Sequence, residues 1–272
     1  MKFSFLKIKL LWLLPILSLF ISSALQAQDS LLTFVSFDKI KIHYEVKGEG
    51  APVVLVHGFI VDSESWKRSS LYNDLLAGGF KVITLDLRGN GKSDKPHNPE
   101  AYENDAEAKD IVALADLLGL KKYSVVGYSR GAIIASRVLL MDARVDKTVL
   151  GGMGADFTNP QWPRRIMFYE ALMGKETKEL EGALKRIKEQ GLDQLALAYM
   201  QKAQPSTSKA EFSKVKKPVL VICGSEDEDN GSSKELAALI PKSDYVRVPG
   251  NHNNASRSKE FSEAVISFIN KK

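Results

Sequence analysis

The chain has 272 residues, of which 44% are hydrophobic and 26% charged, and its formal net charge is +5. This length suits one globular domain, or one domain with an insertion, and it allows a full core without disulfide staples. The single cysteine, Cys223, excludes an intramolecular disulfide.

The first 27 residues have the pattern of a secretory signal peptide. A start that carries Lys2 leads into an apolar stretch over 10–21, and small residues then offer cleavage after Ala24 or Ala27. The apolar stretch is shorter than the roughly 20 residues that cross a bilayer, so cleavage without stable membrane insertion is favoured over an uncleaved anchor. Loss of three lysines would leave an exported, periplasmic or secreted chain of formal charge +2, too low to indicate a nucleic-acid partner.

Strand patterns and helix patterns alternate after this segment. Residues 31–36 and 40–46 predict two antiparallel strands, and the alternation in the second places His43 on a solvent-facing side. Apolar runs predict further strands over 52–56, 80–85, 123–128 and 147–153. Helix patterns lie between these runs, over 62–77, 102–118 and 129–141.

The alternation breaks between Phe157 and Val215, where apolar residues are spaced as in three short helices. Aromatic and methionine side chains of this insertion could line an apolar pocket above the sheet, or could simply pack the insertion onto the body. Strands over 218–223 and 245–248 and a closing amphipathic helix follow.

The whole pattern predicts an α/β fold with a mainly parallel, doubly wound, eight-stranded sheet flanked by helices. A short helical lid is inserted after the sixth strand. The predicted division is a signal peptide over 1–27, a core domain over 28–156 and 216–272, and a lid over 157–215.

The turn Gly127-Tyr128-Ser129-Arg130-Gly131 joins a predicted strand to a predicted helix. A side chain at the tip of so sharp a turn sits in a crowded backbone, and glycines two positions before and after it relieve the crowding. Ser129 is then exposed above the edge of the sheet, as in a nucleophile elbow. A serine hydroxyl is a poor nucleophile until a base takes its proton, so this turn requires a histidine and a group that orients it.

The chain has four histidines. His43 lies on a polar strand face, His57 in the turn after the third strand, and His97 in a long loop. Only His252 follows the last predicted strand, on a loop that we expect to open beside Ser129. We therefore predict that His252 is the base; the alternative is an ordinary surface histidine.

The acid is predicted to be Asp227, three residues after Gly224 at the end of a strand. A carboxylate at this place can accept the Nδ1 proton of the histidine and hold Nε2 toward the serine. Rival carboxylates stand nearby in the same loop or after the preceding strand; they are Glu226, Asp229 and Asp156.

An oxyanion hole requires two preorganised N–H donors. The backbone of Arg130, the residue after the predicted nucleophile, supplies one. Phe59 is predicted to supply the second, because Gly58 lets the chain turn back toward the elbow after His57.

Taken in order, these motifs resemble the α/β-hydrolase superfamily from about Leu31 to the C-terminus. The motifs that carry the resemblance are His57-Gly58-Phe59, Asp86-Leu87-Arg88-Gly89-Asn90-Gly91-Lys92-Ser93, Gly127-Tyr128-Ser129-Arg130-Gly131, Gly224-Ser225-Glu226-Asp227 and Gly250-Asn251-His252. The resemblance implies a serine hydrolase that forms an acyl-enzyme with a small-molecule acyl substrate, and it implies neither a metal nor an organic cofactor.

Two points of the resemblance bear on specificity. Relatives that dehalogenate or open epoxides place Asp at the elbow, so Ser129 argues against those activities. Arg130 departs from the small or apolar residue common after the nucleophile, and we expect it to put a cation near the mouth of the site.

The sequence thus predicts an exported carboxylic-ester hydrolase that uses Ser129, His252 and Asp227. The alternatives are lactone, amide or thioester cleavage, perhydrolysis, and a non-catalytic ligand-binding member of the fold. The physiological substrate, acyl-chain length, stereochemistry and oligomeric state stay open.

Overall fold

The computed structural model describes residues 32–228 and 230–271. The predicted signal peptide over 1–27 and the rival acid Asp229 lie outside these residues. No helix in the described part is long and apolar enough to cross a membrane.

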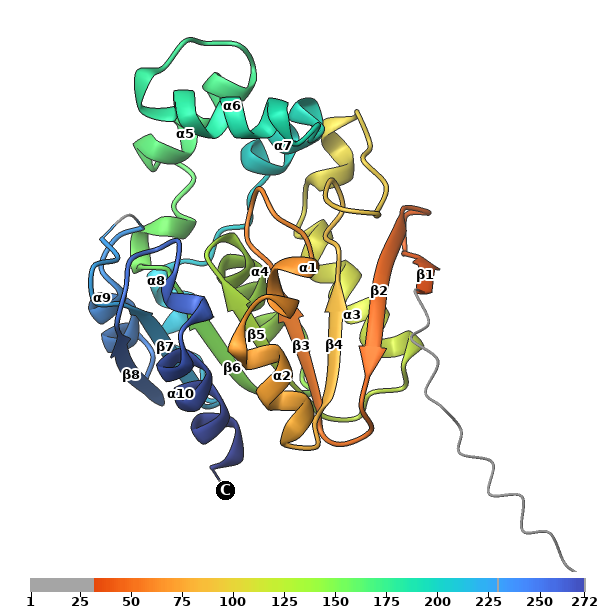
Figure 1. The fold of residues 1–272 in the computed structure, drawn as a ribbon, viewed down its shortest axis with the longest axis vertical. Coiled ribbons are helices and arrows are strands. Elements are labelled where there is room, and N and C mark those ends of the chain that lie inside the picture. The colour runs from red at the N-terminus through yellow and green to blue at the C-terminus, as the bar shows by residue number, and fades with distance from the viewer. Residues whose placement is uncertain (1–31, 229, 272) are drawn as a thin grey trace, which may run out of the picture.

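Eight strands form one sheet in the order β1-β2-β4-β3-β5-β6-β7-β8 (Figure 1). The β1–β2 and β2–β4 pairings are antiparallel and the other five are parallel, so the predicted fold class is confirmed. The strands are β1 Leu32–Val35, β2 Lys41–Lys47, β3 Pro52–Val56, β4 Lys81–Leu85, β5 Tyr123–Tyr128, β6 Val145–Gly151, β7 Val219–Gly224 and β8 Ser243–Val248.

Helices cover both faces of the sheet. The helices are α1 Glu64–Lys67, α2 Ser70–Ala77, α3 Ala106–Leu117, α4 Arg130–Met141, α5 Pro163–Leu172, α6 Glu181–Glu189, α7 Gln194–Lys202, α8 Lys209–Phe212, α9 Ser233–Leu239 and α10 Lys259–Asn270. Alternate residues of one strand enter different cores: Val53 packs in the layer with α1, α2 and α10, and Val54 in the layer with α3, α4, α8 and α9. A strand buried on both faces must be apolar throughout, which explains the continuous run over 52–56.

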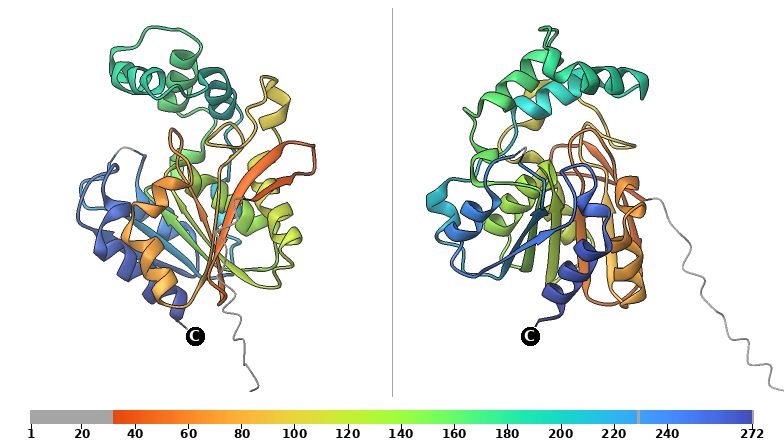
Figure 2. Two further views of the ribbon diagram at one scale, coloured as in Figure 1. Left: turned by 45° about the vertical axis from the view of Figure 1, so that its right-hand side comes forward. Right: turned by 60° about the vertical axis from the view of Figure 1, so that its left-hand side comes forward.

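Helices α5, α6 and α7 form a lid above the end of the sheet where the parallel strands finish (Figures 1 and 2). Their own core contains Leu172, Ile187, Leu197 and Met200, and it rests on Tyr102 from the loop that follows β4. Phe212 of α8 packs instead in the main core with Val215, so the chain rejoins the body before the predicted lid ends. The lid is therefore built mainly from three helices with a small core.

His43 is 5% exposed, so the expectation that it faces solvent is wrong. The turn after β4 covers this side of β2: the Ser93 hydroxyl accepts the His43 N–H at 2.9 Å, and the Asp86 N–H donates to the His43 carbonyl oxygen at 2.9 Å. Alternation indicates which residues share a face of a strand, but it carries no information about a loop that covers that face.

Two helix boundaries also differ from those predicted. The helix expected over 62–77 is divided into α1 and α2. The helix expected from 102 begins at Ala106, because Asn104 and Asp105 adopt left-handed φ values of 56° and 59° that interrupt a helix.

Candidate active site

Ser129 lies at the tip of the turn between β5 and α4, with φ 55° and ψ −127°. A positive φ is unfavourable for a residue with a side chain, and costs of about 1–3 kcal/mol are usual for such positions. The turn nevertheless directs the serine away from the strand and into the loops at the carboxyl end of the sheet.

The two glycines of the turn are required by close backbone contacts. A Cβ on Gly127 would lie 2.2 Å from the Gly131 carbonyl oxygen, and a Cβ on Gly131 would lie 2.2 Å from the Val56 carbonyl oxygen. No side chain fits at either place. This is the crowding that the spacing of the glycines predicts.

A line of hydrogen bonds joins the three residues that the sequence singles out. His252 Nε2 lies 2.9 Å from Ser129 Oγ, and His252 Nδ1 lies 2.9 Å from Asp227 Oδ2. Because a carboxylate only accepts, Nδ1 carries the proton and the lone pair of Nε2 faces the serine hydroxyl. The Asp227 side chain is 3% exposed and the His252 side chain 17% exposed, so the line is shielded from bulk water.

Each group comes from a loop at the carboxyl end of a parallel strand. Ser129 follows β5, Asp227 follows β7 and His252 follows β8. The rivals Glu226 and Asp156 are exposed, and the ion pair of the His252 ring is with Asp227. Among the described carboxylates, Asp227 alone bonds the histidine.

Three further residues support His252, and sequence reasoning did not identify them. The Asn230 amide donates to the Gly152 carbonyl oxygen at 3.1 Å and lies 3.1 and 3.2 Å from the two ring nitrogens. Tyr128 donates its hydroxyl to the His252 carbonyl oxygen at 2.9 Å. Gly152 has φ 62°, and a Cβ there would lie 3.2 Å from His252 Cε1. Tyr128 occupies a variable position of the elbow motif, and no quoted motif includes Asn230 or Gly152.

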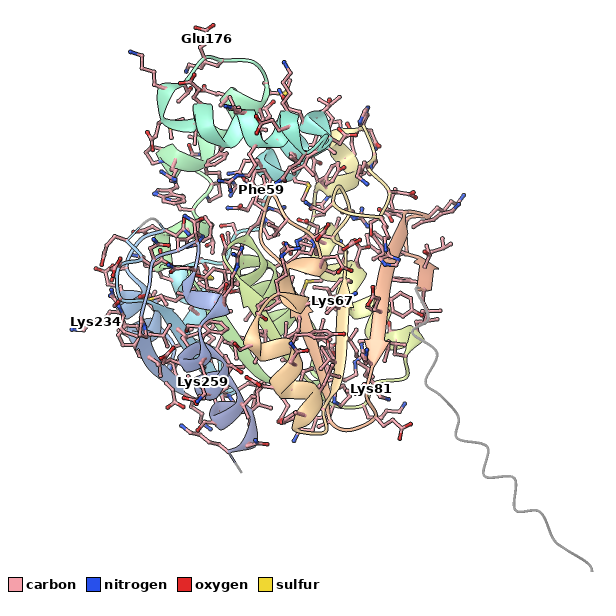
Figure 3. All side chains as sticks on the ribbon, in the orientation of Figure 1. Phe59, Lys67, Lys81, Glu176, Lys234 and Lys259 are labelled. Atoms are coloured by element: carbon pink, nitrogen blue, oxygen red, sulfur yellow. The ribbon has the colours of Figure 1, made fainter. Side chains whose placement is uncertain are left out.

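The turn that carries Phe59 lies directly against the elbow. A Cβ on Gly58 would lie 3.6 Å from Ser129 Cβ, because β3 is the parallel neighbour of β5. The Asn90 side-chain amide donates to the carbonyl oxygens of Phe59 and Val61 at 2.8 and 3.0 Å, and these two bonds hold the loop in place. Figure 3 shows Phe59 between the body of the sheet and the lid.

Neutral His57 stabilises the same turn through two hydrogen bonds of its ring. Its Nε2 accepts the Leu87 N–H at 3.0 Å, so the proton must be on Nδ1, which donates to the Gly58 carbonyl oxygen at 2.7 Å. The ring is 1% exposed, and burial lowers the pKa of His57 below its ordinary value.

Protonation of His57 should therefore weaken the fold at acid pH. Since the unfolded chain takes up this proton more readily, stability is complete above the ordinary pKa of 6.5 and declines as the pH falls toward the lower pKa of the folded state. The loss approaches about 1.4 kcal/mol per pH unit within that window. Urea unfolding of the wild type and of His57→Gln between pH 5 and pH 8 would measure it. Identical pH dependence in both proteins would contradict this assignment.

The Arg130 side chain is buried, 1% exposed, so the expectation of a cation at the mouth of the site is wrong. Its guanidinium donates to both oxygens of Glu107 on α3, at 2.7 and 2.5 Å, and to the Met200 carbonyl oxygen on α7 at 3.0 Å. Glu107 neutralises the charge, and the third bond ties the lid to the elbow. The motif identified the position but gave no sign of its partner 23 residues earlier in the chain.

A cavity of about 610 Å³ opens over Ser129 between the body and the lid. Its apolar walls come from Phe59, Phe157, Trp162 and Phe168. The rings of Phe59 and Phe168 pack edge to face, with their centroids 5.9 Å apart. Both roles considered for the lid residues therefore occur, since Leu172 and Met200 pack inside the lid while Phe157, Trp162 and Phe168 line the cavity.

Comparisons with known proteins agree with this architecture. A family model described as the alpha/beta hydrolase fold matches residues 51–180. A putative non-heme chloroperoxidase of Synechocystis is 40% identical over 113 residues, which are 41% of this chain and 40% of that protein. Epoxide hydrolase 3 of Siraitia grosvenorii is 39% identical over 101 residues, which are 37% of this chain and 31% of that protein. The matched segments thus span less than half of these relatives.

The likeness in structure extends further along the chain. The crystal structure of a bromoperoxidase from Bacillus anthracis has a TM-score of 0.69 and 26% identity, and the match covers 89% of this chain and 100% of that one. The sheet order, the matched family model and this structural likeness lead to one assignment. The chain has the α/β-hydrolase fold.

Proposed function

We propose that this protein is an exported serine hydrolase that cleaves a carboxylic ester through an acyl-enzyme. One observation carries the proposal: Ser129, His252 and Asp227 form a continuous line of 2.9 Å hydrogen bonds, and Ser129 and His252 of this line border the cavity of about 610 Å³. Export rests on the pattern of residues 1–27.

In the first half of the reaction, His252 Nε2 takes the Ser129 proton as Oγ bonds to the carbonyl carbon. The carbonyl oxygen becomes an oxyanion, for which the Phe59 and Arg130 backbone N–H groups are the proposed donors. Collapse breaks the ester C–O bond, and the histidine gives its proton to the departing alcohol. Asp227 stabilises the imidazolium while it exists.

In the second half, water replaces the alcohol. His252 takes a proton from the water, and the hydroxide bonds to the acyl carbon. The second oxyanion collapses, the bond from the acyl carbon to Ser129 Oγ breaks, and the proton returns to the serine. The products are a carboxylic acid and the free enzyme.

Perhydrolysis is a second candidate, because two relatives carry the names non-heme chloroperoxidase and bromoperoxidase. In that reaction hydrogen peroxide attacks the same acyl-enzyme in place of water, and the product is a peracid. Adding hydrogen peroxide to an ester assay and titrating peracid would distinguish the two acceptors. Epoxide opening is disfavoured, because the relatives that open epoxides are expected to have Asp at the elbow, where this chain has Ser129.

Fluorophosphonate labelling tests the proposal. The reagent phosphonylates an activated serine as fluoride leaves, so the wild type should gain one phosphonyl group at Ser129, found by mass spectrometry of its peptides. The labelled protein should also lose its hydrolysis of a short p-nitrophenyl ester. A protein that neither labels nor cleaves the ester would favour the non-catalytic, ligand-binding alternative.

A further inference from the structure

The cavity over Ser129 is lined by positive charge. Five arginines border it, and none of the described residues that line it is Asp or Glu. These arginines are Arg130, Arg164, Arg165, Arg186 and Arg257. A cavity of one sign attracts a ligand of the opposite sign, provided that the charges are not already neutralised by the protein.

Most of these charges are neutralised or exposed to water. Arg130 is paired with Glu107, and Arg164 donates to Glu179 at 2.8 Å on the lid surface. Arg186 and Arg257 are exposed, so water screens them. The remaining member, Arg165 on α5, is 6% exposed and has no carboxylate partner in the described part of the chain.

The Arg165 guanidinium is only partly satisfied. Nε donates to the Gln201 carbonyl oxygen at 3.3 Å, and Nη2 donates to those of Lys202 and Gln204 at 2.9 and 2.6 Å. Nη1 is buried and has no hydrogen-bond partner among the described residues. Burial and the neighbouring Arg130 lower the pKa of Arg165 to about 10, so the group is still charged at neutral pH.

Carbonyl oxygens at the C-terminal end of α7 explain part of this arrangement. A helix C-terminus carries about half a negative charge, which favours a cation but does not neutralise one. A buried charge that lacks a counter-ion is strongly unfavourable, and a free Nη group offers the donors that a carboxylate accepts. A single uncompensated guanidinium matches a monoanion better than a phosphate dianion.

We propose that Arg165 binds a carboxylate on the substrate, so that the preferred ester carries one anionic group in its acyl or alcohol part. The inference rests on the proposed hydrolase function, since it names the substrate class of that site. Bound carboxylate supplies the missing counter-charge within the same cavity as Ser129.

Arg165 also borders a second, smaller cavity of about 360 Å³, where Glu103 is the acidic residue. Glu103 is exposed and makes no ion pair with Arg165 in the described part of the chain. A Glu103→Gln variant therefore tests whether this outer cavity affects selectivity. We expect its ester preference to equal that of the wild type.

The experiment compares charged and neutral esters of the same shape. Monoethyl adipate against ethyl 5-carbamoylpentanoate varies the acyl part, and butyryloxyacetate against butyryloxyacetamide varies the alcohol part. We expect the wild type to have a higher kcat/KM for the carboxylate of at least one pair. In Arg165→Met that preference should fall by about 10- to 100-fold, mainly through KM, while the neutral ester changes little. Arg165→Lys should recover part of it, since lysine keeps the charge but not the planar fork.

Arg164→Met is the matched control, because Arg164 borders the same cavity but is already paired with Glu179. Its carboxylate preference should remain that of the wild type. Equal loss on charged and neutral esters in Arg165→Met would show a purely structural role and overturn the inference. If Arg165→Met does not fold, inhibition of the wild type decides: the monoanion 5-carbamoylpentanoate must compete better than neutral adipamide, and equal inhibition overturns the inference. Absence of hydrolysis of every ester, with no labelling, would instead refute the proposed function.

Discussion

Replacing Ser129 with alanine should lower ester hydrolysis by about 10⁶-fold in kcat, as is usual when the nucleophile of a serine triad is removed. The loss is large because His252 Nε2, 2.9 Å from Oγ, then has no proton to accept and no acyl-enzyme forms. Steady-state assays with a p-nitrophenyl ester would measure the loss in kcat, and circular dichroism would verify that the fold persists. Activity within tenfold of the wild type would contradict Ser129 as the nucleophile.

The backbone conformation at residue 129 leads to a second prediction, which concerns the stability of variants at this position. Ser129 has φ 55° and ψ −127°, which glycine adopts freely and alanine does not. Relief of about 1–3 kcal/mol of strain should exceed the roughly 1 kcal/mol that the flexibility of glycine costs. We therefore expect Ser129→Gly to be inactive but more stable than Ser129→Ala in urea unfolding. A less stable glycine variant would show that the turn is not strained.

Replacing Asp227 with asparagine should lower kcat by about 10⁴-fold while leaving the shape of the site almost unchanged. The asparagine amide can donate to His252 Nδ1, and the ring then takes the tautomer whose Nε2–H cannot accept the serine proton. The loss of the negative charge also destabilises the imidazolium of the transition state. Steady-state kinetics with a short p-nitrophenyl ester would measure this effect.

Asp156→Asn and Glu226→Gln are the matched controls for Asp227. Both remove one exposed carboxylate near the site without touching the His252 ring, so their kcat should stay close to the wild-type value. A large loss in Asp156→Asn, with little loss in Asp227→Asn, would reassign the acid to the loop after β6.

The sequence predicts the sheet well because burial on both faces leaves a strong local signal. Strands such as β3 are continuous apolar runs, and the helices between them show apolar spacing. The predicted site residues are also brought together, since parallel strands finish at one edge and deliver Ser129, Asp227 and His252 to neighbouring loops. The order of these residues along the chain and their positions at strand ends were enough to predict that they meet.

Contacts between distant segments could not be predicted from these patterns. Nothing near Asn230 marks it as a neighbour of the His252 ring, and nothing near Glu107 indicates that it neutralises Arg130. His43 was misplaced for the same reason, because a loop from another part of the chain covers it. Such pairings depend on the path of loops in space, which hydrophobic periodicity does not encode.

The bond from Arg130 to the Met200 carbonyl oxygen bears on any attempt to exchange lids between relatives. A graft that replaces α7 would have to present a carbonyl at the same place, or a guanidinium beside the nucleophile would lose one of its acceptors. Helices α5 and α6 make no hydrogen bond to Arg130, so chimaeras limited to the outer faces of these two should retain the elbow. Such chimaeras could then vary the substrate range through α5 and α6 while Ser129 and its catalytic partners stay unchanged.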